Sequence, residues 1–165
     1  MTDRIPDSVA SSSLLADFKT HLRITANDLD ADLRQKLMAA VLSAEKHIGR
    51  VILKSRFVTT TVLHTLQLHS PVIEVEGVEI DGVVTQDYTL VGNLLKLNDG
   101  VTGSNMKVTY IAGRDYIPYD IKAAVLMQAA TLFNNPADRV ETLVTASQNL
   151  LRPYRRWGAG DAECD

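Results

Sequence analysis

The sequence is poor in cysteine and in aromatic residues, and it has no excess of positive charge. Cys164 is the single cysteine among 165 residues, so no intramolecular disulfide can form and a cysteine-ligated metal site is excluded. Aromatic residues make up 5% of the chain, so the core has to be built from aliphatic side chains. The formal net charge is −3, whereas a domain that grips nucleic acid is usually basic. A soluble protein with an aliphatic core fits these numbers.

No stretch of the sequence indicates export or membrane insertion. The opening MTDRIPDSVASSS lacks the apolar core of a signal peptide. No run approaches the roughly 18 apolar residues of a membrane-spanning helix. We therefore expect a protein that is made and assembled in the cytosol and has no membrane partner.

The signatures of common active sites are also missing. The sequence has neither a Gly-x-Ser-x-Gly nucleophile motif nor a His-Glu-x-x-His zinc motif. DLDADL begins like a calcium loop, but Leu33 and Ala39 stand where that loop needs glycine and glutamate. VTYIAGRDY has one glycine, whereas a phosphate-binding loop needs several. We predict no catalytic residue, no metal site and no cofactor.

Two other classes of function stay open as alternatives. A small enzyme with an unmarked pocket would need a site among His64, His69, Glu74 and Asp87. A nucleic-acid-binding regulator is the second alternative, and the acidic balance of the chain disfavours it.

Hydrophobic spacing predicts an α+β fold, mostly α-helical with about four helices, and a small antiparallel β meander inserted in the middle. We expect a flexible arm over 1–12, a single domain over 13–151 and a docking tail over 152–165. Within the domain, helices are predicted in 13–53 and 118–151, and the meander in 57–112.

Two glycines are predicted to act as structural turns. The alternation of apolar residues changes phase at Gly77, which indicates a β-bulge. Gly113 lies between the last predicted strand and a helix, where it would supply a backbone angle that other residues resist.

The helix that contains IKAAVLMQAATLF is apolar on nearly every side. Such a helix is buried on every side. Burial in the core of the domain and contact with another subunit are equally compatible with this pattern. For the second case, the candidate interface residues are Ala124, Met127, Ala130 and Phe133.

Charge is distributed unevenly along the chain. Between Phe57 and Gly113 there are six acidic residues and two lysines, a balance of −4. The segment near the C-terminus is instead basic and aromatic, and arginine and aromatic residues often anchor interfaces. Its candidate docking residues are Arg152, Tyr154, Arg155 and Trp157.

The order of these segments resembles the head–tail connector, or adaptor, family of tailed bacteriophages, the gp6-like proteins of HK97-type phages and prophages. The resemblance covers about residues 12–156 and is most specific at VTYIAG, at IPYDIKAAVLMQAATLFNN and at LLRPYRR. One departure is that Pro136 follows the apolar helix closely, without the longer polar loop of many relatives.

This resemblance implies a non-enzymatic structural protein of the virion neck that is assembled in the host cytoplasm. Its members form a ring, commonly of twelve copies, that binds under the portal protein. Double-stranded DNA passes through the ring without sequence-specific contacts during packaging and ejection, and head-completion or tail proteins attach below. Another neck-ring component, such as a head-completion or stopper protein, is the nearest alternative.

Overall fold

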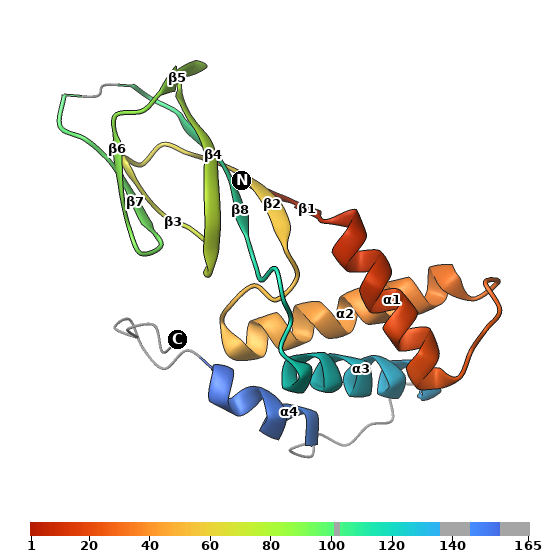
Figure 1. Ribbon diagram of the computed structural model, residues 1–165. Coiled ribbons are helices and arrows are strands. Elements are labelled where there is room, and N and C mark those ends of the chain that lie inside the picture. The colour runs from red at the N-terminus through yellow and green to blue at the C-terminus, as the bar shows by residue number, and fades with distance from the viewer. Residues whose placement is uncertain (101–102, 136–145, 156–165) are drawn as a thin grey trace. The chain divides into compact units, whose positions relative to one another are not determined.

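The computed structural model describes residues 1–100, 103–135 and 146–155 (Figure 1). The chain forms two compact units, where the sequence analysis expected a single domain. We call Met1–Ser8 together with Leu53–Asp115 the β unit, and Val9–Ile52 together with Tyr116–Asp165 the helical unit. The sequence begins in the β unit, leaves it after Ser8, returns at Leu53 and leaves it again after Asp115, so neither unit is a continuous segment of sequence. The α+β fold class is confirmed.

Within its described residues, the β unit contains two antiparallel sheets, where one meander was predicted. The larger sheet has the order β1-β2-β8-β4-β5, and the smaller has the order β3-β7-β6. The strands are β1 (Thr2–Pro6), β2 (Ser55–Thr61), β3 (Thr65–Gln67), β4 (Val72–Ile80), β5 (Val83–Thr85), β6 (Tyr88–Val91), β7 (Leu94–Leu97) and β8 (Met106–Ala112).

Alternating burial explains the centre of the larger sheet. Along β8, Met106, Val108, Tyr110 and Ala112 are buried and the residues between them are more exposed. The antiparallel register places Tyr110 opposite Phe57 of β2. The sheet therefore turns one face towards the core of the β unit.

Strand β1 replaces part of the arm that the sequence analysis expected over 1–12. It pairs with β2 along its whole length, and the Met1 amino group donates to the Thr60 carbonyl oxygen at 3.1 Å. Arg4 lies 5.6 Å from the centroid of the Phe57 ring, and its Nε donates to Ser55 Oγ at 2.9 Å. TDRIP lacks an apolar alternation because its backbone pairing and Arg4, not hydrophobic side chains, attach it to the sheet.

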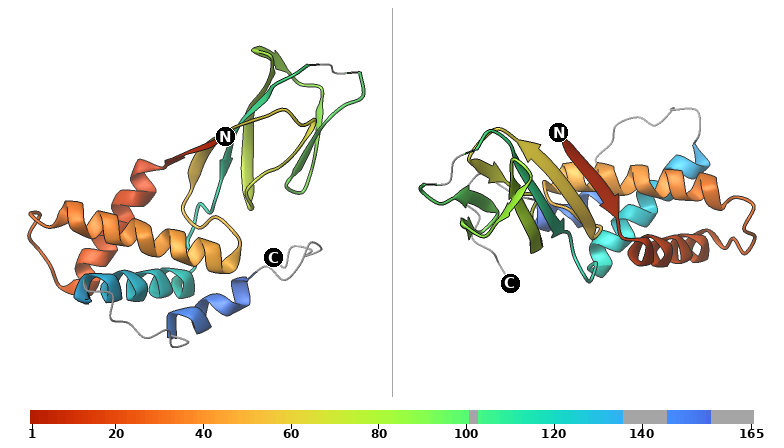
Figure 2. Two further views of the ribbon diagram at one scale, coloured as in Figure 1. Left: turned by 180° about the vertical axis from the view of Figure 1, so that it is seen from behind. Right: turned by 90° about the horizontal axis from the view of Figure 1, so that it is seen from above.

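The helical unit consists of four helices and a short 3₁₀ turn within the described residues. They are α1 (Ser8–Leu22), α2 (Asp30–Ile48), α3 (Tyr119–Asn134), α4 (Ala146–Leu151) and η1 (Arg152–Tyr154). Helices α2 and α3 lie side by side, and α4 packs against α3 (Figures 1 and 2). Helix α1 starts at Ser8, earlier than the predicted start at residue 13. Pro136, which follows the apolar helix closely in the sequence, lies outside the described residues.

Helix α2 shows why its position was predictable. Its apolar residues recur at helical spacing and form one stripe inside the unit: Leu33, Leu37, Ala40, Val41, Ala44 and Ile48 are all buried. The helix ends at Gly49, whose φ of 71° suits glycine and whose N–H donates to the Glu45 carbonyl oxygen at 2.8 Å. The Glu45 side chain is also buried, and its Oε1 accepts the Ile52 N–H at 2.8 Å. In the part of the chain that the structure describes, no helix has the length and apolar character needed to cross a membrane.

Candidate interaction surfaces

The residues considered for an enzyme active site have structural surroundings. His69 stacks on Phe57 with ring centroids 4.7 Å apart, and its Nδ1 lies 2.7 Å from the Tyr110 hydroxyl. Burial of Tyr110 raises the pKa of its phenol, which stays protonated and able to hydrogen-bond. His69 thus caps an aromatic stack of the β unit. Among the described residues, no group of three His, Cys, Asp or Glu could hold a metal ion.

The other three members of that set are exposed on turns and strands of the β unit. The carbonyl oxygen of His64 accepts the Leu97 N–H at 3.0 Å, next to β3. Asp87 lies between β5 and β6, where its backbone N–H donates to Thr85 Oγ1 at 3.1 Å. Glu74 lies on β4 opposite Ile111. These positions give no indication of a shared catalytic pocket.

The Ala112-Gly113-Arg114 corner is filled by backbone. Gly113 has a φ of 121°, and a Cβ at this position would lie 2.7 Å from both the N and Cα atoms of Lys54. Its N–H donates to the Pro71 carbonyl oxygen at 2.9 Å. Two chain segments therefore meet where a phosphate group would need space. At Gly77 the β4–β8 register shifts, but a Cβ there would meet nothing within 4 Å.

Helix α3 has one face inside the helical unit and another face exposed. Ile121, Ala124, Val125, Leu126 and Ala129 are buried. Ala124 is fully buried, so its inclusion among the candidate interface residues is corrected: this position belongs to the core of the unit. The all-round apolar pattern concealed which face was which, because alanine is compatible with both.

The remaining candidate interface residues reach the surface to different degrees. Met127 is 37% exposed, while Ala130 and Phe133 are half-buried. Lys36 Nζ lies 5.7 Å from the centroid of the Phe133 ring, a cation–π contact within the unit. Met127 is therefore the most accessible of the four.

A stripe of uncharged residues covers the exposed face of α3. Tyr116 and Tyr119 are 61% and 75% exposed, and Ala123 and Met127 follow Tyr119 at helical spacing. The two tyrosine rings meet edge to face with centroids 5.8 Å apart. We call Tyr116, Tyr119, Ala123 and Met127 the α3 stripe. Sequence reasoning missed both tyrosines, although their spacing from Met127 could have indicated them.

The charged neighbours of the α3 stripe are engaged within the helical unit. Lys122 Nζ donates to Asp17 Oδ2 at 2.8 Å. Asp120 Oδ2 accepts the Tyr154 hydroxyl at 3.3 Å. Lys122 is therefore paired with an opposite charge, and Asp120 keeps its negative charge beside the stripe while it accepts a hydrogen bond within the unit.

The predicted docking segment is held against α3 at its start. Tyr154 lies in η1 and is half-buried, and its hydroxyl reaches Asp120 near the start of α3. Arg152 and Arg155 are exposed on either side of it. Trp157, the fourth predicted docking residue, lies outside the described residues. The described part of the docking segment therefore presents two exposed arginines beside a partly buried tyrosine.

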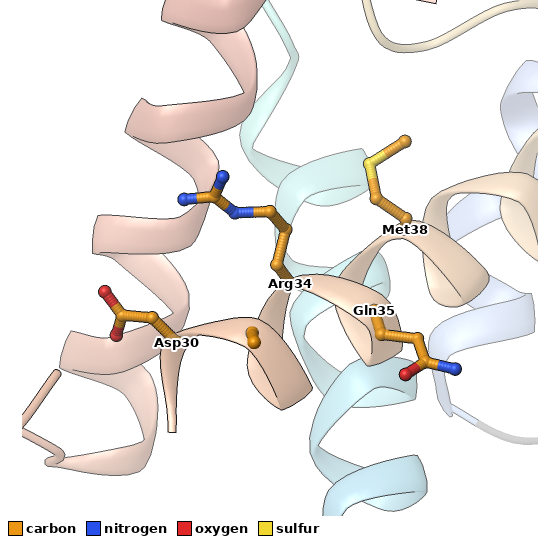
Figure 3. A pocket seen from close by; sticks show the side chains of 5 residues that line it. Asp30, Arg34, Gln35 and Met38 are labelled. Atoms are coloured by element: carbon orange, nitrogen blue, oxygen red, sulfur yellow. The ribbon is translucent and has the colours of Figure 1, made fainter. Parts of the chain in front are cut away.

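A shallow open depression lies along the first half of α2. Asp30, Ala31, Arg34, Gln35 and Met38 line it, and Arg34 and Met38 project to the same side of the helix (Figure 3). Lys19 Nζ donates to Asp30 Oδ1 at 2.7 Å, so this carboxylate is paired. Leu42, one turn beyond Met38, is 44% exposed. We call Ala31, Arg34, Gln35, Met38 and Leu42 the α2 face.

Comparison with known proteins identifies the fold through solved structures. No protein-family model and no curated protein matches this sequence. A chain from the neck of an empty gene transfer agent (GTA) particle, computed with C6 symmetry, has a TM-score of 0.78 and 20% identity. A chain from the neck of the native GTA particle, computed with C12 symmetry, has a TM-score of 0.76 and 18% identity. A chain from the virion of the native particle has a TM-score of 0.73 and 17% identity.

These likenesses extend over the whole fold. In all three, the match covers 98% of this chain and 98% of the other. This chain therefore shares the fold of chains from a neck and a virion of a gene transfer agent.

Proposed function

We propose that this protein is a structural component of the neck of a tailed-phage-like particle. It forms the connector ring beneath the portal, through which double-stranded DNA passes. The single observation that supports this most is the likeness to neck chains across 98% of both sequences. The sequence resemblance to gp6-like adaptors points to the same part of the particle from segment order alone.

A ring requires each copy to bind its neighbour through heterologous surfaces that close on rotation. Helix α3 is the element that we assign to this contact, with Met127 and Ala130 on its accessible sides. A twelvefold ring is the form that the family resemblance implies, and a neck chain of the same fold occurs in a C12-symmetric assembly. The protein is accordingly proposed to be located in the virion neck and to assemble in the host cytoplasm.

The portal is the partner that we assign to η1 and the residues after it. Arg152 and Arg155 are exposed, and Tyr154 is held in place by Asp120. Arginine and tyrosine are enriched among residues that dominate binding energy, particularly where one side is already ordered. Trp157 is proposed to extend this docking surface.

DNA is proposed to pass through the ring without being retained. Every phosphate that a protein neutralises adds affinity that has to be broken again. The segment between Phe57 and Gly113 has a net charge of −4. Within it, Lys107 Nζ lies 3.2 Å from Glu79 Oε2, so this lysine is paired. Few cations are thus left in this segment to bind phosphates. We assign no catalytic role and no cofactor.

A head-completion or stopper role within the same neck is the second candidate. The similar chains are described as parts of a neck, without a more precise position in it. If the protein is the connector, we propose that head-completion or tail proteins bind it on the side away from the portal. Which of these two roles applies is decided by whether the protein binds portal directly.

Light scattering over a wide range of concentration, with negative-stain images, tests the proposed function. We expect closed rings, formed either by the free protein or on purified portal. The variant Arg152→Glu/Arg155→Glu should bind portal more weakly while its ring formation is unchanged. Rings that do not bind portal would favour the head-completion or stopper role. A protein that forms no ring, with or without portal, would contradict both roles.

A further inference from the structure

We propose that neighbouring copies contact each other through two different faces of the helical unit, the α3 stripe of one copy packing on the α2 face of the next. This inference rests on the proposed ring. It adds Tyr116, Tyr119 and Ala123 on one side of the contact and Arg34, Met38 and Leu42 on the other.

The α3 stripe has the properties of a surface that is buried by another protein. Tyr119 is 75% exposed and Tyr116 is 61% exposed, and the edge-to-face contact between them restrains both rings before any partner binds. Rigid aromatic side chains supply contact area at a small cost in entropy. Of the flanking charges, Lys122 is paired with Asp17, and Asp120 accepts a hydrogen bond from Tyr154 within the unit.

The α2 face is chemically complementary to that stripe. Met38 and Leu42 offer aliphatic and thioether surface, and the depression beside Met38 offers space for an aromatic ring. Arg34 is exposed, and it has no hydrogen-bond or ion-pair partner within residues 1–100, 103–135 and 146–155. A guanidinium group stacks favourably on the face of a tyrosine ring. Arg34 of one copy is therefore placed on Tyr116 or Tyr119 of its neighbour.

The two faces also match in length. From Tyr119 to Met127 the stripe spans about 12 Å, and from Ala31 to Leu42 the α2 face spans about 16 Å, at ~1.5 Å of helix rise per residue. Two helices can thus cross within the length of either face.

Symmetry favours a second copy as the occupant of the stripe. Chains of the same fold occur in necks computed with C6 and C12 symmetry. Contact of the α3 stripe with itself would give a two-fold dimer and stop there, whereas contact with a different face propagates around a ring. The pairing of α3 stripe with α2 face meets that requirement within one unit.

Mixing two variants, each defective in one face, tests the pairing. Tyr119→Asp places a charge in the α3 stripe and should abolish binding through it. Met38→Asp does the same for the α2 face. Each variant alone should remain a monomer, with self-association weakened roughly 30-fold or more, as expected for a central interface residue. A 1:1 mixture should form a heterodimer and nothing larger, because one intact stripe then meets one intact α2 face. Mass photometry and native mass spectrometry give the masses.

Controls separate the outcomes. Val83→Asp places the same charge on a 70% exposed residue of the β unit and should assemble like the wild type. Ala123→Lys and Arg34→Glu provide a second pair if either aspartate variant shows a lowered melting temperature. Under the conditions in which the wild type forms rings, alone or on portal, variants that still form rings, or two monomeric variants that fail to pair, overturn this inference and leave the ring itself standing. A wild type that forms no ring, alone or on portal, overturns the proposed function and this contact with it.

Discussion

Gly113 and Lys54 approach each other so closely that only a residue without a side chain fits. A Cβ at position 113 would lie 2.7 Å from the Lys54 N and Cα atoms, and 2.9 Å from the Leu53 carbonyl carbon. The neighbouring residues Leu53 and Arg114 form a parallel β-bridge. This contact fixes the end of β8 where the chain leaves the β unit for α3.

Gly113→Ala should destabilise the protein. The φ of 121° is unfavourable for any residue with a Cβ, and the added carbon would collide with backbone, which cannot rotate away. We expect a loss of about 2 kcal/mol or more in the free energy of unfolding, at the upper end of costs for strained backbone positions. Urea denaturation monitored by circular dichroism measures it.

Gly77→Ala is the matched control for this substitution. A Cβ at Gly77 would meet nothing within 4 Å, and its φ lies outside the left-handed region. The change should alter the free energy of unfolding by less than about 1 kcal/mol. An equal loss of stability in both variants would contradict the conclusion that position 113 requires a residue without a side chain.

Ala124 and Ala123 are adjacent in sequence and should respond oppositely to enlargement. Ala124 is fully buried, so Ala124→Leu should overpack the core and cost about 1–3 kcal/mol of stability. Ala123 is exposed, so Ala123→Leu should change stability by less than about 0.5 kcal/mol. Thermal and urea denaturation of the two variants measure the difference. Similar losses for both would contradict the division of α3 into a buried and an exposed face.

The elements that the sequence predicted well are those whose burial follows one period. Every residue of the apolar stripe of α2 is buried, and β8 alternates along its whole length. The phase change at Gly77 corresponds to a register shift in the structure. In each case a local pattern was sufficient, because one face of the element meets a core.

The features that were not predicted depend on strand pairing between distant segments, or on which of two equally apolar helix faces is buried. β1 pairs through backbone groups with β2, which is distant in the sequence, and such pairing leaves no trace in side-chain periodicity. The two sheets of the β unit have the same kinds of strands, so their separation was not visible. In α3 the apolar residues surround the helix, and neither the burial of Ala124 nor the exposure of Tyr119 follows from spacing. The candidate surfaces were therefore predicted less completely than the fold.

Glu45 is predicted to be a structural residue of the helical unit. Its side chain is buried, and its Oε1 accepts the Ile52 N–H at 2.8 Å beyond the end of α2. Glu45→Ala would leave that backbone donor without this acceptor, at a cost of about 1–3 kcal/mol. Glu45→Gln keeps an acceptor oxygen and should lose less. Ser43→Ala, an exposed position two residues earlier, is the control, and chemical denaturation that ranked it equal to Glu45→Ala would contradict this role.

Tyr110 should make the stability of the protein fall at alkaline pH. Burial raises the pKa of its phenol above the ordinary value of about 10, so the unfolded chain releases this proton first. The stabilisation is complete below about pH 10 and is lost as the pH rises through the raised pKa of the folded state. One such group contributes a slope of up to about 1.4 kcal/mol per pH unit.

Tyr110→Phe isolates this contribution. At neutral pH the variant loses the hydrogen bond to His69 Nδ1, which is 2.7 Å long in the wild type, and should be less stable by about 1 kcal/mol. Between about pH 10 and pH 11 its free energy of unfolding should decline less steeply than that of the wild type. Urea denaturation at a series of pH values measures both slopes. Parallel slopes would contradict the burial of a protonated Tyr110, because only a phenol held neutral in the folded state can produce the difference.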